Sequence, residues 1–112
     1  MKPVVTVVSL GPGDPKLLTL QTADALRMAR CLILRTARHR AVEWLREEGV
    51  SFTDFDTLYD EYEDFDALHA EMARRLWAAA AEKAVTFAVI DAQTDGAVRA
   101  LRIGGGVLRR PL

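Results

Sequence analysis

The sequence predicts an α/β domain with three layers, in which helices cover both faces of a mostly parallel sheet of four or five strands. Two observations support this fold class. Short apolar runs alternate with segments of helical periodicity, an order typical of parallel sheets with right-handed helical crossovers. The first run, residues 4–10, has little polar interruption, as expected of a strand that is buried on both faces.

Size and composition suit a single folded unit. The chain has 112 residues, of which 50% are hydrophobic and 28% are charged, and this excludes a disordered chain. By area scaling, a chain of this mass buries about two thirds of its unfolded surface, which is enough for a core of its own. We therefore expect one domain over residues 1–112.

The first half of the chain predicts two strands and two helices. The run of Gly and Pro at residues 11–15 ends the first strand, and apolar residues at helical spacing then predict a helix over about 17–29. Residues 31–34 predict the second strand. An amphipathic helix is expected over 38–48, with Gly49 as its left-handed C-terminal cap.

The second half begins with a weak third strand at 50–52 and an acidic connector at 54–66. The strongest helix is expected over 66–83, because four apolar residues fall on one stripe: Leu68, Met72, Leu76 and Ala80. Residues 85–90 predict the fourth strand. A polar turn and a last helix over 96–103 follow, and three glycines lead into a short tail, 107–112.

Ligands of open parallel sheets bind beyond the carboxyl ends of the strands. The loops in which to look for chemistry are therefore 11–16, 35–38, 54–66 and 91–95. The first of these matches neither known phosphate-binding loop, because it lacks the third glycine of the dinucleotide fingerprint and the Gly-Lys-Ser/Thr of a Walker loop. Pro12 and Pro15 also remove two backbone donors. The loop is then either a structural turn, with Asp14 capping the first helix, or the stiff rim of a different ligand site.

No metal site is expected. Asp54, Asp56 and Asp60 lie in an acidic stretch, but Tyr59 stands where a calcium loop needs glycine, so a solvated connector is favoured. The single cysteine, Cys31, makes structural zinc improbable. A nucleotide pyrophosphohydrolase would need both a phosphate loop and clustered carboxylates, and the sequence offers neither.

Basic residues gather after the second strand. Arg35, Arg38, His39 and Arg40 are expected either to form a small rim that receives a carboxylate-bearing ligand or to be a solvated helix start. His69 is expected on the exposed side of the long helix. No residue is assigned a catalytic role.

Charge and hydropathy restrict the partners and the location that we expect for the protein. Its net charge of −1 provides no field for nucleic acid or an anionic membrane, and no apolar run approaches the roughly 20 residues that span a bilayer. No signal peptide is visible, and the single cysteine suits a reducing compartment. We therefore expect a cytoplasmic protein without nucleic-acid or membrane partners.

One motif resembles a known family. The strand at 4–10, the Gly11-Pro12-Gly13-Asp14 turn, Leu17-Leu18-Thr19-Leu20 and the helix after them are similar to the opening of the tetrapyrrole (corrin/porphyrin) methylases. Leu34-Arg35-Thr36, the Trp44–Phe52 spacing and the acidic stretch at 55–62 look most like the subgroup that is often fused to a MazG-type pyrophosphohydrolase.

The resemblance implies an S-adenosylmethionine-dependent methyltransferase fold of two α/β domains, with the cofactor in the cleft between them and a tetrapyrrole in a trough on the first. It covers residues 4 to about 100, which correspond to the first domain, and we expect this chain to lack the family's C-terminal domain. By resemblance, Pro12 would contact the cofactor, and Val89, Ile90 and Asp91 stand where a Gly-Asp-Pro loop would wrap its methionine part. The trough residues are Gly11, Gly13, Asp14 and Arg35, and the branch making uroporphyrin-type products has an acid at the place of this arginine.

Two readings of function follow. The first is the N-terminal part of a tetrapyrrole-methylase-like methyltransferase, inactive as this isolated chain. The alternative is a non-catalytic binding or regulatory module that keeps the fold but has lost the methyl-donor loop, because Ile90 replaces the close backbone approach that glycine permits. In either case we expect a homodimer, since apolar surface around Ile90 would otherwise be exposed.

Overall fold

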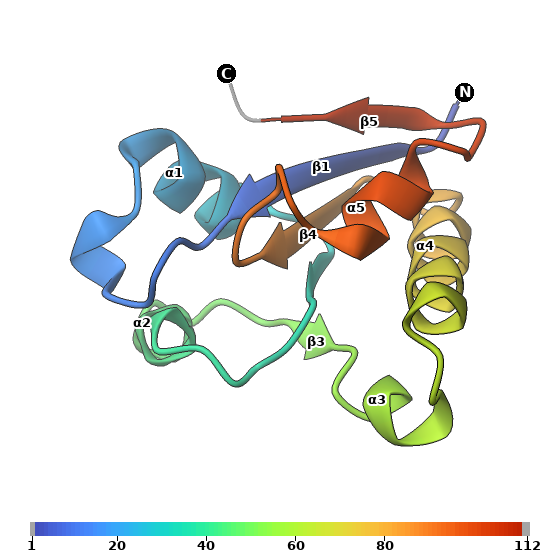
Figure 1. Ribbon diagram of the computed structural model, residues 1–112. Coiled ribbons are helices and arrows are strands. Elements are labelled where there is room, and N and C mark those ends of the chain that lie inside the picture. Colours follow the sequence, from blue (N-terminus) through green and yellow to red (C-terminus); the bar gives the residue numbers. More distant parts are fainter. Residues whose placement is uncertain (1, 111–112) are drawn as a thin grey trace.

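A computed structural model describes residues 2–110 and has a five-stranded, all-parallel sheet at its centre (Figure 1). The strand order is β3-β2-β4-β1-β5. The strands are β1 (Val4–Ser9), β2 (Leu32–Leu34), β3 (Thr53–Asp54), β4 (Val85–Val89) and β5 (Val107–Arg109). The helices are the short 3-10 turn η1 (Pro15–Leu17), α1 (Leu20–Met28), α2 (Ala41–Glu47), α3 (Leu58–Glu61), α4 (Phe65–Ala80) and α5 (Gly96–Leu101).

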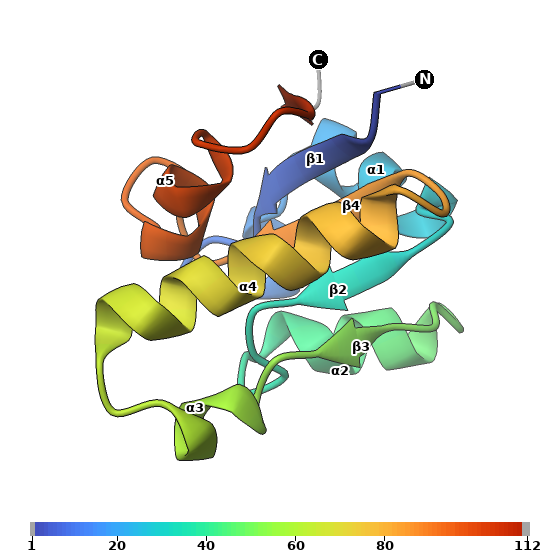
Figure 2. The same ribbon diagram turned by 90° about the vertical axis from the view of Figure 1, so that its right-hand side faces the viewer.

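The helices form one layer on each face of the sheet, which confirms the predicted α/β architecture. Figure 2 shows α4 in front of the sheet, with α1 and α2 behind it. Leu26 of α1 and Leu45 of α2 pack on one face in a cluster with Val8, whereas Met72 of α4 and Leu101 of α5 pack on the other. Two apolar clusters therefore enclose the sheet.

The strand β4 lies in the middle of the sheet, and all five of its residues are buried. It pairs with β1 from Val5 opposite Val85 to Ser9 opposite Val89, and with β2 on its other side. A strand covered on both faces needs no alternation of polar and apolar residues. This burial explains why the sequences of β1 and β4 are nearly continuous apolar runs.

The first helix begins later than the periodicity predicts. Residues 15–17 form the 3-10 turn η1, and Leu18 is extended, so α1 starts at Leu20. The hydroxyl of Thr19 accepts a hydrogen bond from the backbone N–H of Thr22 at 3.0 Å and so caps α1. The helix therefore begins about three residues later than the periodicity predicts, because Thr19 provides its N-terminal cap.

The third strand and the acidic connector also differ from expectation. The strand lies at Thr53–Asp54 rather than at 50–52, because Ile33 of β2 pairs with Thr53. The connector is not simply solvated: it contains α3, and Phe55 and Leu58 are buried in the core. Beyond the last helix, residues that the sequence leaves as a tail form β5, which pairs with β1. The sheet therefore has five strands.

A loop of glycines covers Trp77 of α4 on its way from α5 to β5. A Cβ atom added to Gly104 would lie 2.1 Å from the indole Nε1 of Trp77, and one added to Gly106 would lie 2.3 Å from Cζ3 and 2.8 Å from the carbonyl oxygen of Pro3. A Cβ on Gly105 would meet nothing within 4 Å. Gly104 and Gly106 thus allow the backbone to approach the indole closely.

These contacts predict different costs for three neighbouring substitutions. Gly106→Ala and Gly104→Ala should each lower the free energy of unfolding by about 1–3 kcal/mol, because the added methyl group overpacks the Trp77 contact. Gly105→Ala, the matched control, should stay within about 0.5 kcal/mol of wild type. Urea denaturation followed by circular dichroism measures all three. Equal losses at the three positions would contradict the close approach.

Candidate functional site

The ends of β1 and β4 hold the two turns on which the sequence places its candidate residues. The pairing of these strands continues past their last residues: Leu10 N–H donates to the carbonyl of Val89 at 2.7 Å, and Gly11 N–H donates to that of Ile90 at 3.0 Å. The Ser9 hydroxyl accepts from the backbone N–H of Ala92 at 2.9 Å. The β1–α1 turn and the β4–α5 loop therefore leave the sheet side by side.

This pairing brings together three of the four residues expected at the cofactor. Pro12 follows the Gly11 hydrogen bond directly and is exposed, Ile90 is 53% exposed, and Asp91 is exposed. Val89 differs, because its side chain is only 1% exposed and its carbonyl oxygen already accepts from Leu10. Val89 thus supports the loop from within the core, and the surface that a ligand can reach is formed by its neighbours.

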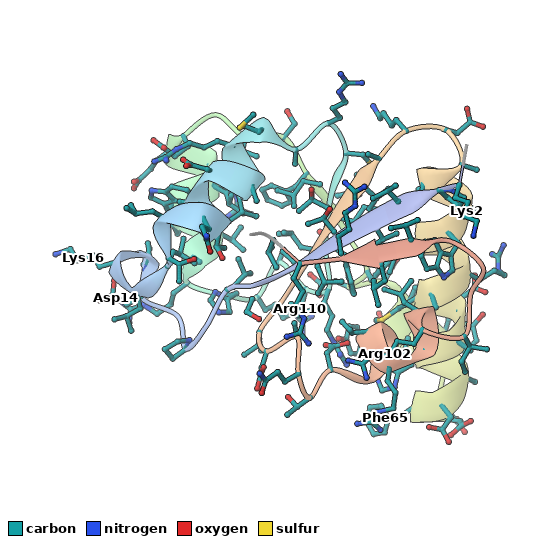
Figure 3. All side chains as sticks on the ribbon, turned by 90° about the horizontal axis from the view of Figure 1, so that it is seen from above. Lys2, Asp14, Lys16, Phe65, Arg102 and Arg110 are labelled. Atoms are coloured by element: carbon teal, nitrogen blue, oxygen red, sulfur yellow. The ribbon has the colours of Figure 1, made fainter. Side chains whose placement is uncertain are left out.

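The β1–α1 turn contains the residues expected at a substrate rim. Gly11 has φ +73° and Gly13 has φ +138°, conformations that favour glycine. Gly13 is buried against the side chain of Arg40, at the start of α2. The Asp14 carboxylate accepts from Lys16 N–H at 2.9 Å, and Figure 3 shows these two residues together at one end of the molecule. Asp14 therefore caps η1, and the expectation that it caps the first helix is wrong.

His39 links the same turn to α2. Its Nδ1 accepts from the backbone N–H of Ala41 at 3.0 Å, and its Nε2 lies 2.8 Å from the carbonyl oxygen of Gly11. The residue at the helix N-cap, Arg40, makes no side-chain cap hydrogen bond. The sequence suggested a helix start here, but nothing in it indicated the contact with Gly11, 28 positions away.

Arg35, the fourth expected rim residue, points across the sheet edge toward α4 and α5. Its guanidinium pairs with the carboxylate of Asp95, lies 3.1 Å from Nε2 of His69 and donates to the Tyr59 hydroxyl at 3.0 Å. The side chains of Arg35 and Asp95 are only 19% and 6% exposed. Burial alone would lower the pKa of Arg35, but the hydrogen bond that it donates to Tyr59 and the charge of Asp95 outweigh burial and raise that pKa.

Asp95 serves two elements at once. One of its carboxylate oxygens accepts from the backbone N–H groups of Ala97 at 2.8 Å and Val98 at 3.1 Å, and so caps α5. The other oxygen faces Arg35. Asp95 thereby ties the β4–α5 loop to the end of β2, a role that the sequence did not reveal.

His69 is half-buried, so the expectation of an exposed residue is wrong. A Cβ on Gly96 would lie 2.3 Å from the His69 ring, and the small residue at the start of α5 therefore admits the imidazole. Because a guanidinium has only donors, Nε2 of His69 accepts from Arg35. The expected basic rim is divided: Arg35 is half-buried and turns toward α5, whereas Arg38 and Arg40 are exposed.

Two hollows flank the β4–α5 loop. One of about 470 Å³ is lined by Arg35, His69, Ile90, Asp91, Thr94, Asp95 and Gly96. The other, of about 230 Å³, lies between the loop, the end of β1, the start of α1 and Arg110. Asp91 lines both. The larger hollow is in the size range of small-molecule sites and offers a carboxylate, a hydroxyl and an apolar side chain.

Over residues 2–110, no group of three or more His, Cys, Asp or Glu side chains is arranged to hold a metal ion. Within the same range, no helix is both long enough and apolar enough to cross a membrane.

Comparison with known proteins points to one family. Residues 4–92 match the Tetrapyrrole (Corrin/Porphyrin) Methylases. The chain is also 36% identical over 85 residues to the uncharacterized protein YabN of Bacillus subtilis (strain 168). The aligned part is 76% of this chain but 17% of YabN, so the chain spans only a small part of that relative.

The caps predict which polar residue stabilises the first helix. Thr19→Ala should cost about 0.5–2 kcal/mol of unfolding free energy, and Thr19→Ser, which keeps the acceptor, should cost little. Asp14→Ala should cost less than Thr19→Ala, since it caps only a three-residue turn, and Asp14→Asn should be neutral. Chemical denaturation compares the four variants. A larger loss at Asp14 than at Thr19 would contradict this assignment.

The double role of Asp95 predicts a graded loss. Asp95→Ala should lower the free energy of unfolding by about 2–4 kcal/mol, because it removes the α5 cap and leaves a largely buried guanidinium without its carboxylate. Asp95→Asn keeps a cap acceptor and loses only the charge, so it should recover about 0.5–2 kcal/mol of that loss. Thermal and urea unfolding test this order. Identical losses for the two variants would show that Asp95 does not cap α5.

Proposed function

The chain belongs to the tetrapyrrole (corrin/porphyrin) methylases, and we propose that it forms the first-domain wall of the cofactor cleft in an S-adenosylmethionine-dependent methyltransferase. The observation that carries this proposal is the pairing of β1 and β4 beyond the strand ends, through the hydrogen bond from Gly11 to Ile90. It places two turns next to each other at the carboxyl edge of the sheet, where ligands of such sheets bind.

The residues at this edge suit parts of the cofactor. S-adenosylmethionine supplies an electrophilic methyl group when it is bound. Ile90 and Pro12 offer apolar contact at the ends of the paired turns, and the exposed Asp91 carboxylate can accept hydrogen bonds from an ammonium or a hydroxyl group. The hollow beside Asp91 has about 470 Å³ of space, so the residues present fit such a molecule.

The contribution of this wall to catalysis would be positional. Methyl transfer needs donor and acceptor in line, and holding two reactants in that geometry supplies much of the rate. We propose that Gly11, Gly13 and Asp14 border the trough of a tetrapyrrole-like acceptor. The guanidinium of Arg35 is already bound to Asp95, His69 and Tyr59. Arg35 would therefore influence the trough through these neighbours and not by direct contact with the acceptor.

The other wall of the cleft would come from a second domain, as in the two-domain members that the sequence resembles. The chain spans 17% of YabN, and the activity of any longer protein is part of the proposal. We place the chain with the subgroup that is often fused to a MazG-type pyrophosphohydrolase, on the basis of Leu34-Arg35-Thr36 and the acidic stretch after Phe55.

A specific observation favours a second candidate, a non-catalytic binding or regulatory module. The β4–α5 loop is held by side chains: Ser9 binds Ala92 N–H, and Arg35 pairs with Asp95. Ile90 stands where the resemblance expects a glycine, and its side chain occupies space that a cofactor backbone contact would use. A domain whose β4–α5 loop is closed in this way would keep the substrate trough but would no longer bind the methyl donor.

Calorimetry on the isolated chain tests the need for a second wall. We expect no saturable heat with millimolar S-adenosylmethionine, because one wall buries too little of the ligand. A dissociation constant below about 10 μM, which corresponds to about −7 kcal/mol, would contradict this prediction.

A nuclear magnetic resonance titration separates the two candidate functions. With several millimolar cofactor, the methyltransferase proposal predicts weak shifts confined to the amides of Gly11, Gly13, Ile90, Asp91 and Ala92. The Ile90→Gly variant should enlarge these shifts. Absence of shifts in both proteins would favour the binding module, and shifts elsewhere would contradict the proposed site.

Exposed apolar side chains predict self-association. Ile90 is 53% exposed at the edge of the proposed cleft, and Leu20 of α1 is 85% exposed. We propose that the chain forms a homodimer that covers this edge. Light scattering at about 100 μM should give twice the chain mass, and Ile90→Asp should reduce it. A monomer of 12.4 kDa would overturn the proposal.

A further inference from the structure

The two ring nitrogens of His39 have different partners, and these partners fix the form of the ring. A backbone carbonyl only accepts, so Nε2 must carry a hydrogen to bind Gly11 at 2.8 Å. A backbone N–H only donates, so Nδ1 must be bare to accept from Ala41 at 3.0 Å. Both contacts therefore require the neutral ring with its hydrogen on Nε2.

The carbonyl that His39 holds belongs to the residue that joins the two turns of the candidate site. Gly11 donates its N–H to Ile90 on one side and offers its carbonyl to His39 on the other. Its φ of +73° lies in the left-handed region, and the exposed Pro12 follows. The direction in which Pro12 points is thus set by β4 and by the imidazole together.

We propose that His39 is the positioning residue of the Gly11–Pro12 turn. The relevance of this to a cofactor rests on the function proposed above, but the positioning itself does not. The Nδ1 contact with the N–H of Ala41 serves as a cap for α2, whose N-cap residue Arg40 makes no side-chain cap hydrogen bond. One ring therefore ties the start of α2 to the Gly11–Pro12 turn.

The charges around His39 are mostly positive. Arg35 lines the same small cavity beside the ring, and Arg38 and Arg40 flank it in the chain. The turn that it contacts carries Asp14, whose carboxylate accepts from the backbone N–H of Lys16. The β4 side of the cavity presents the apolar residues Ala88, Val89 and Ile90.

Two substitutions separate the two nitrogens. His39→Asn keeps an acceptor near the position of Nδ1 and loses the reach to Gly11, whereas His39→Gln keeps a donor near the position of Nε2 and loses the local cap. The measurement is amide hydrogen exchange of the full chain, expressed as protection factors. The Gly11 amide, bound to Ile90, reports on the turn, and the Ala41 amide reports on the start of α2.

We expect the Gly11 protection factor to fall at least tenfold in His39→Asn and to be retained in His39→Gln, with the opposite order for Ala41. Equal effects of the two variants on the Gly11 protection factor would overturn the proposal.

The same measurements distinguish failure of the proposed function from failure of the positioning role of His39. If Gly11 protection responds as expected but cofactor produces no shifts at Gly11, Ile90 or Ala92, then His39 positions the turn and the turn is no cofactor contact. If cofactor does shift these amides while Gly11 protection is equal in all His39 variants, the site stands and the positioning role is wrong.

Discussion

The pairing of β1 with β4 is the constraint on which the rest of the structure depends. β4 is buried along its whole length, and it aligns β1 in register from Val5 to Ser9 and then past the strand ends to Gly11 and Ile90. Backbone groups buried at this depth must be paired, so a shift of register would leave donors and acceptors without partners and move side chains to the wrong face. The position of both candidate turns follows from this one ladder.

Side chains from distant elements then fix the turns. Ser9 holds the β4–α5 loop from β1, Asp95 holds it from β2 through Arg35, and His39 holds the β1–α1 turn from α2. Each contact satisfies a polar group that lies partly out of water, where an unpaired group is costly. The carboxyl edge is therefore an organised surface, on which Asp91 lies between two hollows and Ile90 lines the larger of them.

Much of the fold could be predicted from the chain, because burial on both faces leaves a plain pattern in β1 and β4 and helical periodicity leaves one in α4. Shorter elements could not be. β3 has two residues, and its position is decided by pairing with Ile33 rather than by the apolar residues that precede it. β5 has three, and only its partner β1 makes it a strand.

The sequence by itself determined the α/β class, the edge at which ligand chemistry should lie and the family resemblance of residues 4–20, since these depend on patterns local to the chain. Tertiary structure alone decided that Arg35 meets Asp95, that His39 meets Gly11 and that Val89 lies out of a ligand's reach. These partners are 60 and 28 positions apart. No local pattern encodes such contacts, because they arise only when the sheet brings the ends of separate strands together.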